Sequence, residues 1–509
     1  MLTSRSPPAQ LPAAENPHLS VAVLDVQAPP KMTDIAALPE DDIDLRVFAV
    51  TPDSARTLRR VGTWEQLPAQ RVHGFHGMQV WDGIGGGWVT FQADSSTGEL
   101  GWVLENRALA AASAATLEHV AEQQGNVHML WPSKIKALQL PRSAAEDLAH
   151  AGHAGAQLSS PRASREPGSG GRIECEDGTE ITARLVVGAD GANSAVRSAA
   201  GIGTRTYDYS QRGVVSTLRV AGLRNTAWQV FLPSGPVALL PLGDDMASLV
   251  WSTTPEHAAA LEQASKAELV AALNSALSSQ PGIAPGVCSD ATASHAALAG
   301  GVHTAGSTPV SGGWLPSALA SAADAVASNL FRASAAVSPA YPAPTVLDVC
   351  GPVRSFPLKS AAAYRYAREG VALIGDAAHS VHPLAGQGLN LGLGDAKELA
   401  EVLSSAVRGG ADLGDAQVLR KYSKLRSAKV SAMNQVLHTL HWAFHAPVET
   451  REPAAAAGPW AWTRSMGMAG LNMVPPFKAA VATFAMGGAD VEQAAAAAVK
   501  SMIGMPHVR

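Results

Sequence analysis

The apolar residues of this chain follow two spacings, which predict strands and helices. Short apolar or alternating runs, typical of strands, occupy 19–26, 78–82, 88–91, 185–188, 214–220, 237–242, 248–252 and 371–374. Apolar residues three or four apart predict helices at 54–61, 106–123, 257–277, 396–407 and 419–440. The mixture indicates an α/β protein, in which the strands at 214–252 belong to an antiparallel sheet.

Two segments interrupt this pattern. Residues 141–171 are rich in Ser, Ala, Gly and Pro, and residues 280–345 are similar and nearly free of charge. Such segments bury little apolar surface, so we expect a surface loop and a surface insertion outside the core.

Composition and charge narrow the class of protein. The chain has 509 residues, 47% of them hydrophobic, and a net charge of −5, which gives no reason to expect a nucleic-acid partner. Three widely spaced cysteines form neither a zinc spacing nor a disulfide framework, and we expect no metal site. No apolar run is long enough to span a membrane, and the first twenty residues resemble neither a secretory signal nor a clear transit peptide.

The most informative stretch is 371–396. A buried-strand run meets Gly375-Asp376, and a loop with Pro383, Gly386, Gln387 and Gly388 then leads into a helix from about Asn390. Glycines let a backbone lie against a flat ligand, and a helix N-terminus favours negative charge. The stretch therefore indicates a site for an anionic cofactor rather than a plain strand-turn-helix connection.

A second motif lies at 187–197. Asp190 and Gly191 form a tight turn after a strand, and Arg197 supplies a charge suited to a phosphate. Alone this is a weak signal, since a strand-turn with a surface arginine has the same pattern.

Together the two motifs resemble the flavin-dependent aromatic hydroxylases of the para-hydroxybenzoate-hydroxylase fold. The residues at 101–107, 207–211, 227–242, 249–252 and 356–358 are similar to the ubiquinone-biosynthesis members, especially the eukaryotic mitochondrial ones. The resemblance runs from about residue 20 to the C-terminus, outside the two low-complexity segments.

The resemblance implies an α/β fold with a Rossmann-like FAD-binding domain, an antiparallel-sheet substrate domain and C-terminal helices. The boundaries we expect are an atypical N-terminus at 1–18, a discontinuous FAD-binding domain at 19–70, 101–204 and 351–430, a substrate domain at 71–100 and 205–350, and a C-terminal helical region at 431–509.

The resemblance also implies site residues. Arg46 and Arg107 match arginines that contact the flavin, and Asp376 suits the ribityl hydroxyls. No catalytic side chain is assigned, and His379 and His382 are left as structural hydrogen-bonders. The expected cofactor-binding residues are Asp25, Arg46, Arg107, Asp190, Gly191, Arg197, Gly375, Asp376, Pro383, Gly386, Gln387, Gly388 and Asn390.

The implied reaction is hydroxylation of a polyprenyl phenol at ring carbon 5, with FAD and molecular oxygen, through a flavin C4a-hydroperoxide. The electrons would come from NADPH or from a ferredoxin and its reductase. The resemblance further implies a coenzyme Q biosynthetic complex at the matrix face of the mitochondrial inner membrane. A tail with Trp460, Trp462, Met466, Met468 and Phe477 would make peripheral membrane contact or pack on the core.

One expected motif is not found. The strand that ends at Asp25 is preceded by a Pro-rich segment without glycine, where a Gly-x-Gly-x-x-Gly turn is expected, and Gly83–Gly87 has no helix after it. We expect a shortened form of an active enzyme, because the downstream motifs stand unaltered. The alternatives are a non-catalytic scaffold paralogue with impaired FAD binding and a hydroxylase of a small soluble phenol.

Overall fold

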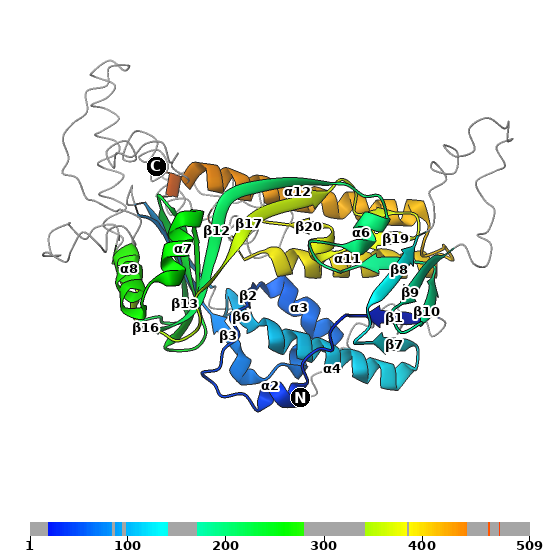
Figure 1. Cartoon of the computed structure of the whole chain (residues 1–509), viewed down its shortest axis with the longest axis horizontal. Coiled ribbons are helices and arrows are strands. Elements are labelled where there is room, and N and C mark those ends of the chain that lie inside the picture. The colour runs from blue at the N-terminus through cyan, green and yellow to red at the C-terminus, as the bar shows by residue number, and fades with distance from the viewer. Residues whose placement is uncertain are drawn as a thin grey trace, which may run out of the picture.

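The computed structural model describes residues 19–83, 87–93, 98–140, 170–278, 342–383, 386–444, 467–468 and 478. The atypical N-terminus at 1–18, most of both low-complexity segments and most of the C-terminal tail lie outside these ranges. Within the described residues the molecule has two halves, one built on a large sheet and one on smaller sheets with long helices (Figure 1).

Among the described residues, the large sheet has nine strands. Its hydrogen-bonded order is β20-β17-β12-β15-β14-β13-β4-β5, and β16 pairs with β12. All its pairs are antiparallel except β13 with β4, which is parallel. The strands are β4 (Gly77–Asp82), β5 (Trp88–Gln92), β12 (Thr204–Ala221), β13 (Thr226–Leu232), β14 (Gly235–Pro241), β15 (Met246–Thr253), β16 (Thr345–Val349), β17 (Arg354–Ala363) and β20 (His379–Ser380).

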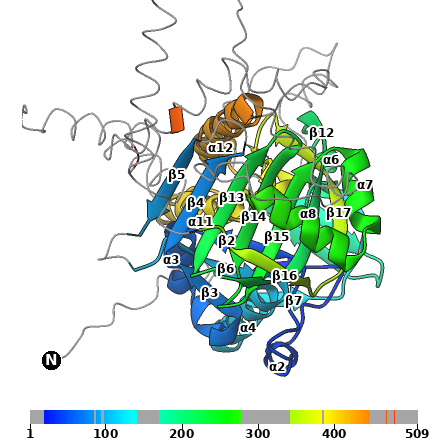
Figure 2. The same ribbon diagram turned by 90° about the vertical axis from the view of Figure 1, so that its left-hand side faces the viewer.

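Two helices, α7 (Pro255–Gln263) and α8 (Lys266–Ser278), cover one face of this sheet (Figure 2). Between them and the strands lies a core that contains Trp81, Trp228 and Trp251, all at most 1% exposed. The helix expected at 257–277 is in fact two, because Ala264 adopts an extended conformation that ends α7.

The other half is assembled from small sheets. The parallel pair β1–β7 forms a two-stranded sheet, and the parallel pair β11–β19 forms another sheet, in which β18 joins β19 antiparallel. Two further three-stranded sheets have the orders β10-β9-β8 and β2-β6-β3. The strands are β1 (Val21–Leu24), β2 (Val47–Val50), β3 (Val72–Phe75), β6 (Gly101–Glu105), β7 (Val127–Leu130), β8 (Ile135–Gln139), β9 (Gly171–Cys175), β10 (Glu180–Ala183), β11 (Val186–Gly188), β18 (Ala367–Arg368) and β19 (Val371–Leu373).

Helices pack around these sheets (Figure 1). The two longest of the described helices pack against β11 and β19 through Leu399, Val402, Leu419, Tyr422 and Val430. The helix α3 begins where the Thr51 hydroxyl accepts the Ser54 N–H and ends at Gly62, whose φ is 86°. The helices are α2 (Met32–Ala36), α3 (Pro52–Val61), α4 (Asn106–Gln124), α6 (Ala195–Ala199), α11 (Gly388–Arg408) and α12 (Ala416–Phe444).

The strand β12 runs through both halves. It has 18 residues and bonds to β15, β16 and β17 along its length. Its register with β17 shifts between Asp208 and Gln211, where Ser210 has a φ of 53°. A bulge of this kind bends a strand, and on its N-terminal side β12 stays paired with β17 as it curves toward α6 (Figure 1).

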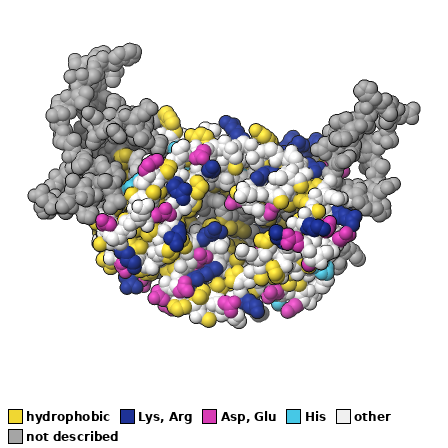
Figure 3. Space-filling view, in the orientation of Figure 1, with side chains coloured by type: hydrophobic (Ala, Val, Ile, Leu, Met, Phe, Trp, Pro, Cys, Tyr) yellow, Lys and Arg dark blue, Asp and Glu magenta, His cyan; other side chains and the backbone are white. Residues whose placement is uncertain are grey.

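The α/β fold with an antiparallel sheet and C-terminal helices is confirmed. No helix among the described residues is both long and apolar enough to cross a membrane. Acidic and basic side chains are interspersed over the described part of the face in Figure 3.

Candidate cofactor and active site

The turn after β19 is the centre of the candidate site. Gly375 has a φ of 58°, which favours glycine, and it opens a short 3-10 helix over Gly375–Ala377. Asp376 lies in the middle of that helix with its side chain exposed. A Cβ on Gly375 would meet no atom within 4 Å, so space lies beside the backbone here.

The loop from Pro383 to α11 is held next to this turn. The Pro383 carbonyl accepts the Gly386 N–H at 2.9 Å, and Gly386 has a φ of 61°. Asn390 accepts the Thr51 N–H at 3.0 Å and donates to the Ala49 carbonyl at 2.8 Å. The loop is thereby fixed to the end of β2.

The N-terminus of α11 follows this loop. Gln387 occupies the N-cap position and makes no side-chain cap hydrogen bond, and a Cβ on Gly388 would meet nothing within 4 Å. The first amides of this 21-residue helix carry the positive end of its dipole.

The second motif meets the first. Asp190 accepts hydrogen bonds from the Val196 N–H at 3.1 Å and from the hydroxyl of Ser194 at 2.5 Å, and Ser194 is the N-cap of α6. Gly191 has a φ of 80°. Arg197 donates to the Ala377 carbonyl at 2.8 Å, which ties the motif to the turn that carries Asp376. The structure thus brings together two motifs that are far apart in the sequence.

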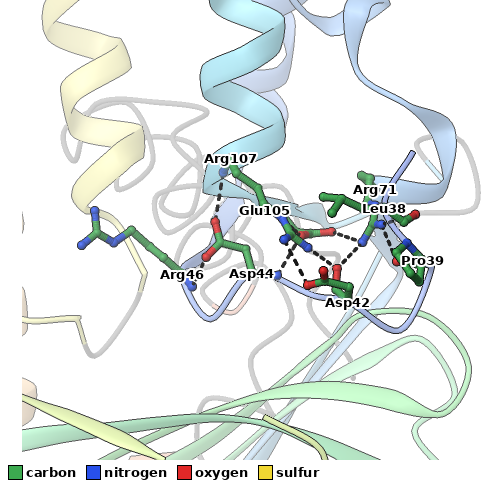
Figure 4. A network of polar contacts seen from close by, with 8 residues as sticks. All are labelled: Leu38, Pro39, Asp42, Asp44, Arg46, Arg71, Glu105 and Arg107. Carbon is green, nitrogen blue, oxygen red and sulfur yellow. Dashed lines mark hydrogen bonds and ion pairs between the residues drawn. The ribbon is translucent and has the colours of Figure 1, made fainter. Parts of the chain in front are cut away.

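Arg46 and Arg107 have different surroundings (Figure 4). The Arg46 side chain points away from Glu105 and Arg107 and toward α11, the helix drawn in yellow. Its positive charge acts to lower the pKa of the Asp376 carboxyl. The Arg107 guanidinium instead contacts Glu105 and Asp42, with the Glu105 contact at 2.9 Å. Glu105 also pairs at 2.9 Å with Arg71, and both of these side chains are 1% exposed.

This network shapes the loop before β2. Arg71 donates to the carbonyls of Leu38, Pro39 and Asp42, and Glu105 accepts the Asp44 N–H at 2.8 Å. The Asp44 carboxylate in turn accepts the N–H groups of Arg46 and Arg107, both at 3.0 Å. The backbone at Arg46 is therefore fixed by buried charges (Figure 4).

Asp25 has local contacts. It follows β1, where its carboxylate accepts the Gln27 N–H at 2.9 Å and its carbonyl accepts the Ser133 N–H at 2.7 Å. It thus lies at the carboxyl end of the β1–β7 pair, the edge at which parallel strands present ligand-binding residues.

Burial and nearby charges together shift three pKa values. Desolvation raises the pKa of the Asp376 carboxyl, although its side chain is exposed overall, and the charges of His379 and Arg46 oppose that shift. Burial lowers the pKa of His382 to about 3, and the neighbouring His441 and His438 add to this. Partial burial by itself would lower the pKa of Arg107, but the carboxylates of Glu105 and Asp42 outweigh this effect and raise that pKa.

A cluster of rings adjoins the Pro383 loop. Tyr209 of β12 lies between His382, His438 and His441, with ring centroids 4.5 to 5.4 Å apart. The Tyr209 hydroxyl and His438 Nδ1 are 3.3 Å apart, and Gln211 is 3.2 Å from His441. The sequence patterns did not predict this cluster, because its members come from β12, α12 and the loop.

Three further buried side chains meet here, and the sequence patterns did not predict their contacts. Asp395 of α11 contacts both His379 Nε2 and Arg426 Nε at 2.6 Å, and it accepts the Gly375 N–H at 2.9 Å. A signal for them exists in the sequence. Arg426 falls in the apolar stripe of α12 with Tyr422 and Val430, and a charge in such a stripe indicates a buried partner.

These residues fit the ring and ribityl end of a flavin. Asp376 offers a carboxylate for hydroxyl groups, the glycine turns leave room for a flat group, and the α11 amides suit negative charge. Arg46 and Arg197 add two positive charges next to the turn.

The chain belongs to the "FAD binding domain" family, whose profile matches residues 95–287 and 326–436. Among its relatives is the mitochondrial ubiquinone biosynthesis monooxygenase COQ6 of Xenopus tropicalis, 33% identical over 88% of this chain and 84% of that protein. The human COQ6 is 34% identical over 86% of this chain and 81% of its own length. The 3-demethoxyubiquinol 3-hydroxylase of Escherichia coli is 28% identical over 76% and 75%.

Solved structures show the same fold. PqsL, a probable FAD-dependent monooxygenase from Pseudomonas aeruginosa, superposes with a TM-score of 0.54 at 20% identity, covering 88% of this chain and 92% of that one. The p-nitrophenol 4-monooxygenase PnpA from Pseudomonas putida gives 0.51 at 17% identity, covering 95% and 92%. The chain is a flavin-dependent monooxygenase, and FAD is its cofactor.

Proposed function

We propose that this protein hydroxylates the aromatic ring of a polyprenyl phenol in ubiquinone biosynthesis, at ring carbon 5. The proposal is carried by one site, here called the cofactor seat, in which Asp376, Arg197 and the N-terminus of α11 come together. It is supported by relatives that are named for ubiquinone biosynthesis. Bound FAD would supply the activation of oxygen, and the chain would supply binding, orientation and exclusion of water.

The large sheet supports a prenyl substrate. In β14, residues that point toward α7 and α8 alternate with the half-exposed Pro236, Ala238 and Leu240. The register places Ala238 opposite Gln229 on one side and Val250 on the other, and Gln229 opposite Val80. The face turned away from α7 and α8 is thus mainly apolar, which suits an isoprenoid chain.

The cofactor contacts are assigned by residue. Asp376 would accept ribityl hydroxyls, and the amides of α11 would face the ring. Arg46 and Arg197 would supply positive charge, with Asp190 and Gly191 setting the position of Arg197. Asp25 and Arg107 complete the proposed set.

We extend the proposal to the cellular setting. The relatives named mitochondrial support a mitochondrial location, which we place at the matrix face of the inner membrane within a coenzyme Q biosynthetic complex. The electrons come from NADPH or from a ferredoxin with its reductase. Of the tail expected either to contact a membrane or to pack on the core, Met468 is described, and it is buried beside Val80, Val89 and Phe231.

The test uses the full chain supplied with FAD. Flavin absorbance and fluorescence measure binding, and turnover is followed with isotopically labelled oxygen by mass spectrometry of the phenol. Parallel reactions contain a polyprenyl phenol or the same phenol without its side chain, and either NADPH or a ferredoxin with its reductase. We expect labelled product from the prenylated phenol, with the ring position read by nuclear magnetic resonance.

Other outcomes would redirect the assignment. Faster turnover of the unprenylated phenol would favour a hydroxylase of small soluble phenols. Absence of FAD binding to the folded chain would contradict a monooxygenase and favour a scaffold role.

A further inference from the structure

We propose that Asp395 is a positioning residue for the cofactor, whose carboxylate clamps both ends of the turn that presents Asp376. The inference rests on the FAD-binding function given above. It assigns to Asp395, with His379 and Arg426, a role in shaping the flavin site and not only in joining two helices.

The geometry of one oxygen atom carries the proposal. Asp395 Oδ2 accepts the Gly375 N–H at 2.9 Å and lies 2.6 Å from His379 Nε2. Gly375 precedes Asp376 and His379 follows it, so a single oxygen holds the chain on both sides of the ligand-facing carboxylate. The His379 ring is also stacked on Tyr366, with centroids 5.5 Å apart, which fixes its orientation.

The other oxygen makes a different connection. Asp395 Oδ1 accepts a hydrogen bond from Arg426 Nε at 2.6 Å, and Arg426 also donates to the Leu391 carbonyl at 3.0 Å. These contacts join α11 to α12 without involving the turn. A carboxylate that served only to connect the helices would need this oxygen alone.

The three side chains are buried, so each hydrogen bond that they failed to make would lower the stability of the fold. The Asp395 side chain is 0% exposed, His379 1% and Arg426 7%. A buried ion pair adds little stability over apolar packing, whereas an apolar residue could not accept the Gly375 N–H. The buried charge is therefore best explained by the geometry that it enforces on the turn.

The close approach of α11 to the turn agrees with this role. A Cβ on Gly392 would lie 3.3 Å from the Gly375 Cα. Asp395 is three residues further along the helix, on the same side. Glycine at position 392 thus lets the helix come near enough for the carboxylate to reach the Gly375 amide.

The experiment compares the full-length wild type with Asp395→Asn, which keeps the shape but replaces one acceptor oxygen by an N–H donor group. FAD affinity is measured by fluorescence titration, and the environment of the bound flavin by visible circular dichroism. We expect the FAD Kd to rise about tenfold or more, with a changed dichroism spectrum. The matched control is Tyr422→Phe, which removes a 2.7 Å bond from α12 to the Leu373 carbonyl but leaves the turn intact.

A double-variant cycle separates positioning from general stability. If Asp395 acts through the turn, then Asp376→Asn combined with Asp395→Asn should bind FAD about as weakly as the worse single variant. If the two losses of FAD affinity instead multiply in the double variant, the inference is overturned. It is also overturned if the Asp395→Asn protein melts at a lower temperature, as is expected of Tyr422→Phe, but keeps the wild-type Kd and dichroism spectrum.

A milder variant covers the case in which Asp395→Asn does not fold. Arg426→Lys keeps the positive charge but loses the Nε–H donor, so Asp395 is less firmly oriented. A smaller rise in Kd with the same spectral change supports the inference, and an unchanged Kd and spectrum overturn it. A wild-type chain that binds no FAD would instead contradict the proposed function.

Discussion

Asp376 is the residue whose surroundings define the proposed cofactor seat. It lies between two clamped positions, and the charges of Arg46 and His379 favour its ionised form against desolvation. Hydrogen bonds to a charged acceptor are worth about 1.5 to 3 kcal/mol. We therefore expect Asp376→Asn to weaken FAD binding about tenfold to a hundredfold, measured by fluorescence titration.

Asp177→Asn is the control for Asp376, because Asp177 lies in the exposed turn between β9 and β10 and accepts the Thr179 N–H. Equal losses of FAD affinity in the two variants would argue against Asp376 as a ligand.

The buried His382 makes the folding stability of the molecule depend on pH. Its pKa is lowered to about 3 by burial from a usual 6.5, so between these values the unfolded chain binds more protons than the folded one. Folding stability must therefore fall as the pH drops below 6.5, by about 1.4 kcal/mol per unit. In His382→Gln the loss between pH 6.5 and 4.5 should be smaller by about 2 to 3 kcal/mol.

Urea unfolding at several pH values measures this difference, and His119→Gln provides a control in which an exposed imidazole is removed from α4. A His382→Gln protein with the pH profile of the wild type would disprove the assignment.

Single residues were predictable where the chain brings them together locally. Gly375, Asp376, Gly386 and Asn390 belong to one turn and one helix start, so their spacing was informative. The pairing of Arg71 with Glu105 was not, because the two meet only when β3 aligns with β6. Asp395 was visible in the motif, but its partner Arg426 comes from another helix.

At the scale of elements, the Glu105 network joins β6, α4 and the loop before β2 (Figure 4). Glu105→Gln would leave Arg71 buried with a weaker partner, and breaking a buried pair costs about 3 to 5 kcal/mol. We expect a loss of that order in the free energy of unfolding, measured with urea.

Glu180→Gln is the matched control, because Glu180 pairs with Arg172 where both side chains are 55% exposed. Such a pair contributes about 1 kcal/mol or less. A Glu105→Gln protein no less stable than Glu180→Gln would show that the buried network adds no stability.

Elements with local patterns were largely predictable from the sequence. The helices at 106–123 and 419–440 and the strands at 78–82 and 88–91 correspond to α4, α12, β4 and β5. The length of β12 and the parallel pairing of β13 with β4 were not predicted, since both depend on strands far away in the sequence. The split of α7 from α8 depends on the extended Ala264, which apolar spacing does not reveal.

On the scale of the whole molecule, β12 makes the two halves one unit. It bonds to β17 near the cofactor seat and to β15 in the large sheet. A ligand at 100 times its Kd adds about 2.7 kcal/mol of stability. We expect FAD to raise the melting temperature of both halves together.

Calorimetry is the suitable measurement, because tryptophans lie in both halves: Trp81, Trp228 and Trp251 in the large sheet, and Trp64 and Trp102 in the other half. Two separate heat-absorption peaks, of which only one moves to higher temperature with FAD, would show that the halves melt independently.

The pairing of β11 with β19 has a consequence for synthesis in the cell. Val186 bonds in register with Val371, and the whole large sheet is encoded between them apart from β4, β5 and β20. Translation proceeds at about 5 to 20 residues per second, so the ribosome must work for roughly ten seconds or longer after making β11 before its partner exists. During that interval the edge of β11 has no β19 to pair with, and the flavin site cannot yet form, because Asp376 and α11 are made after β19.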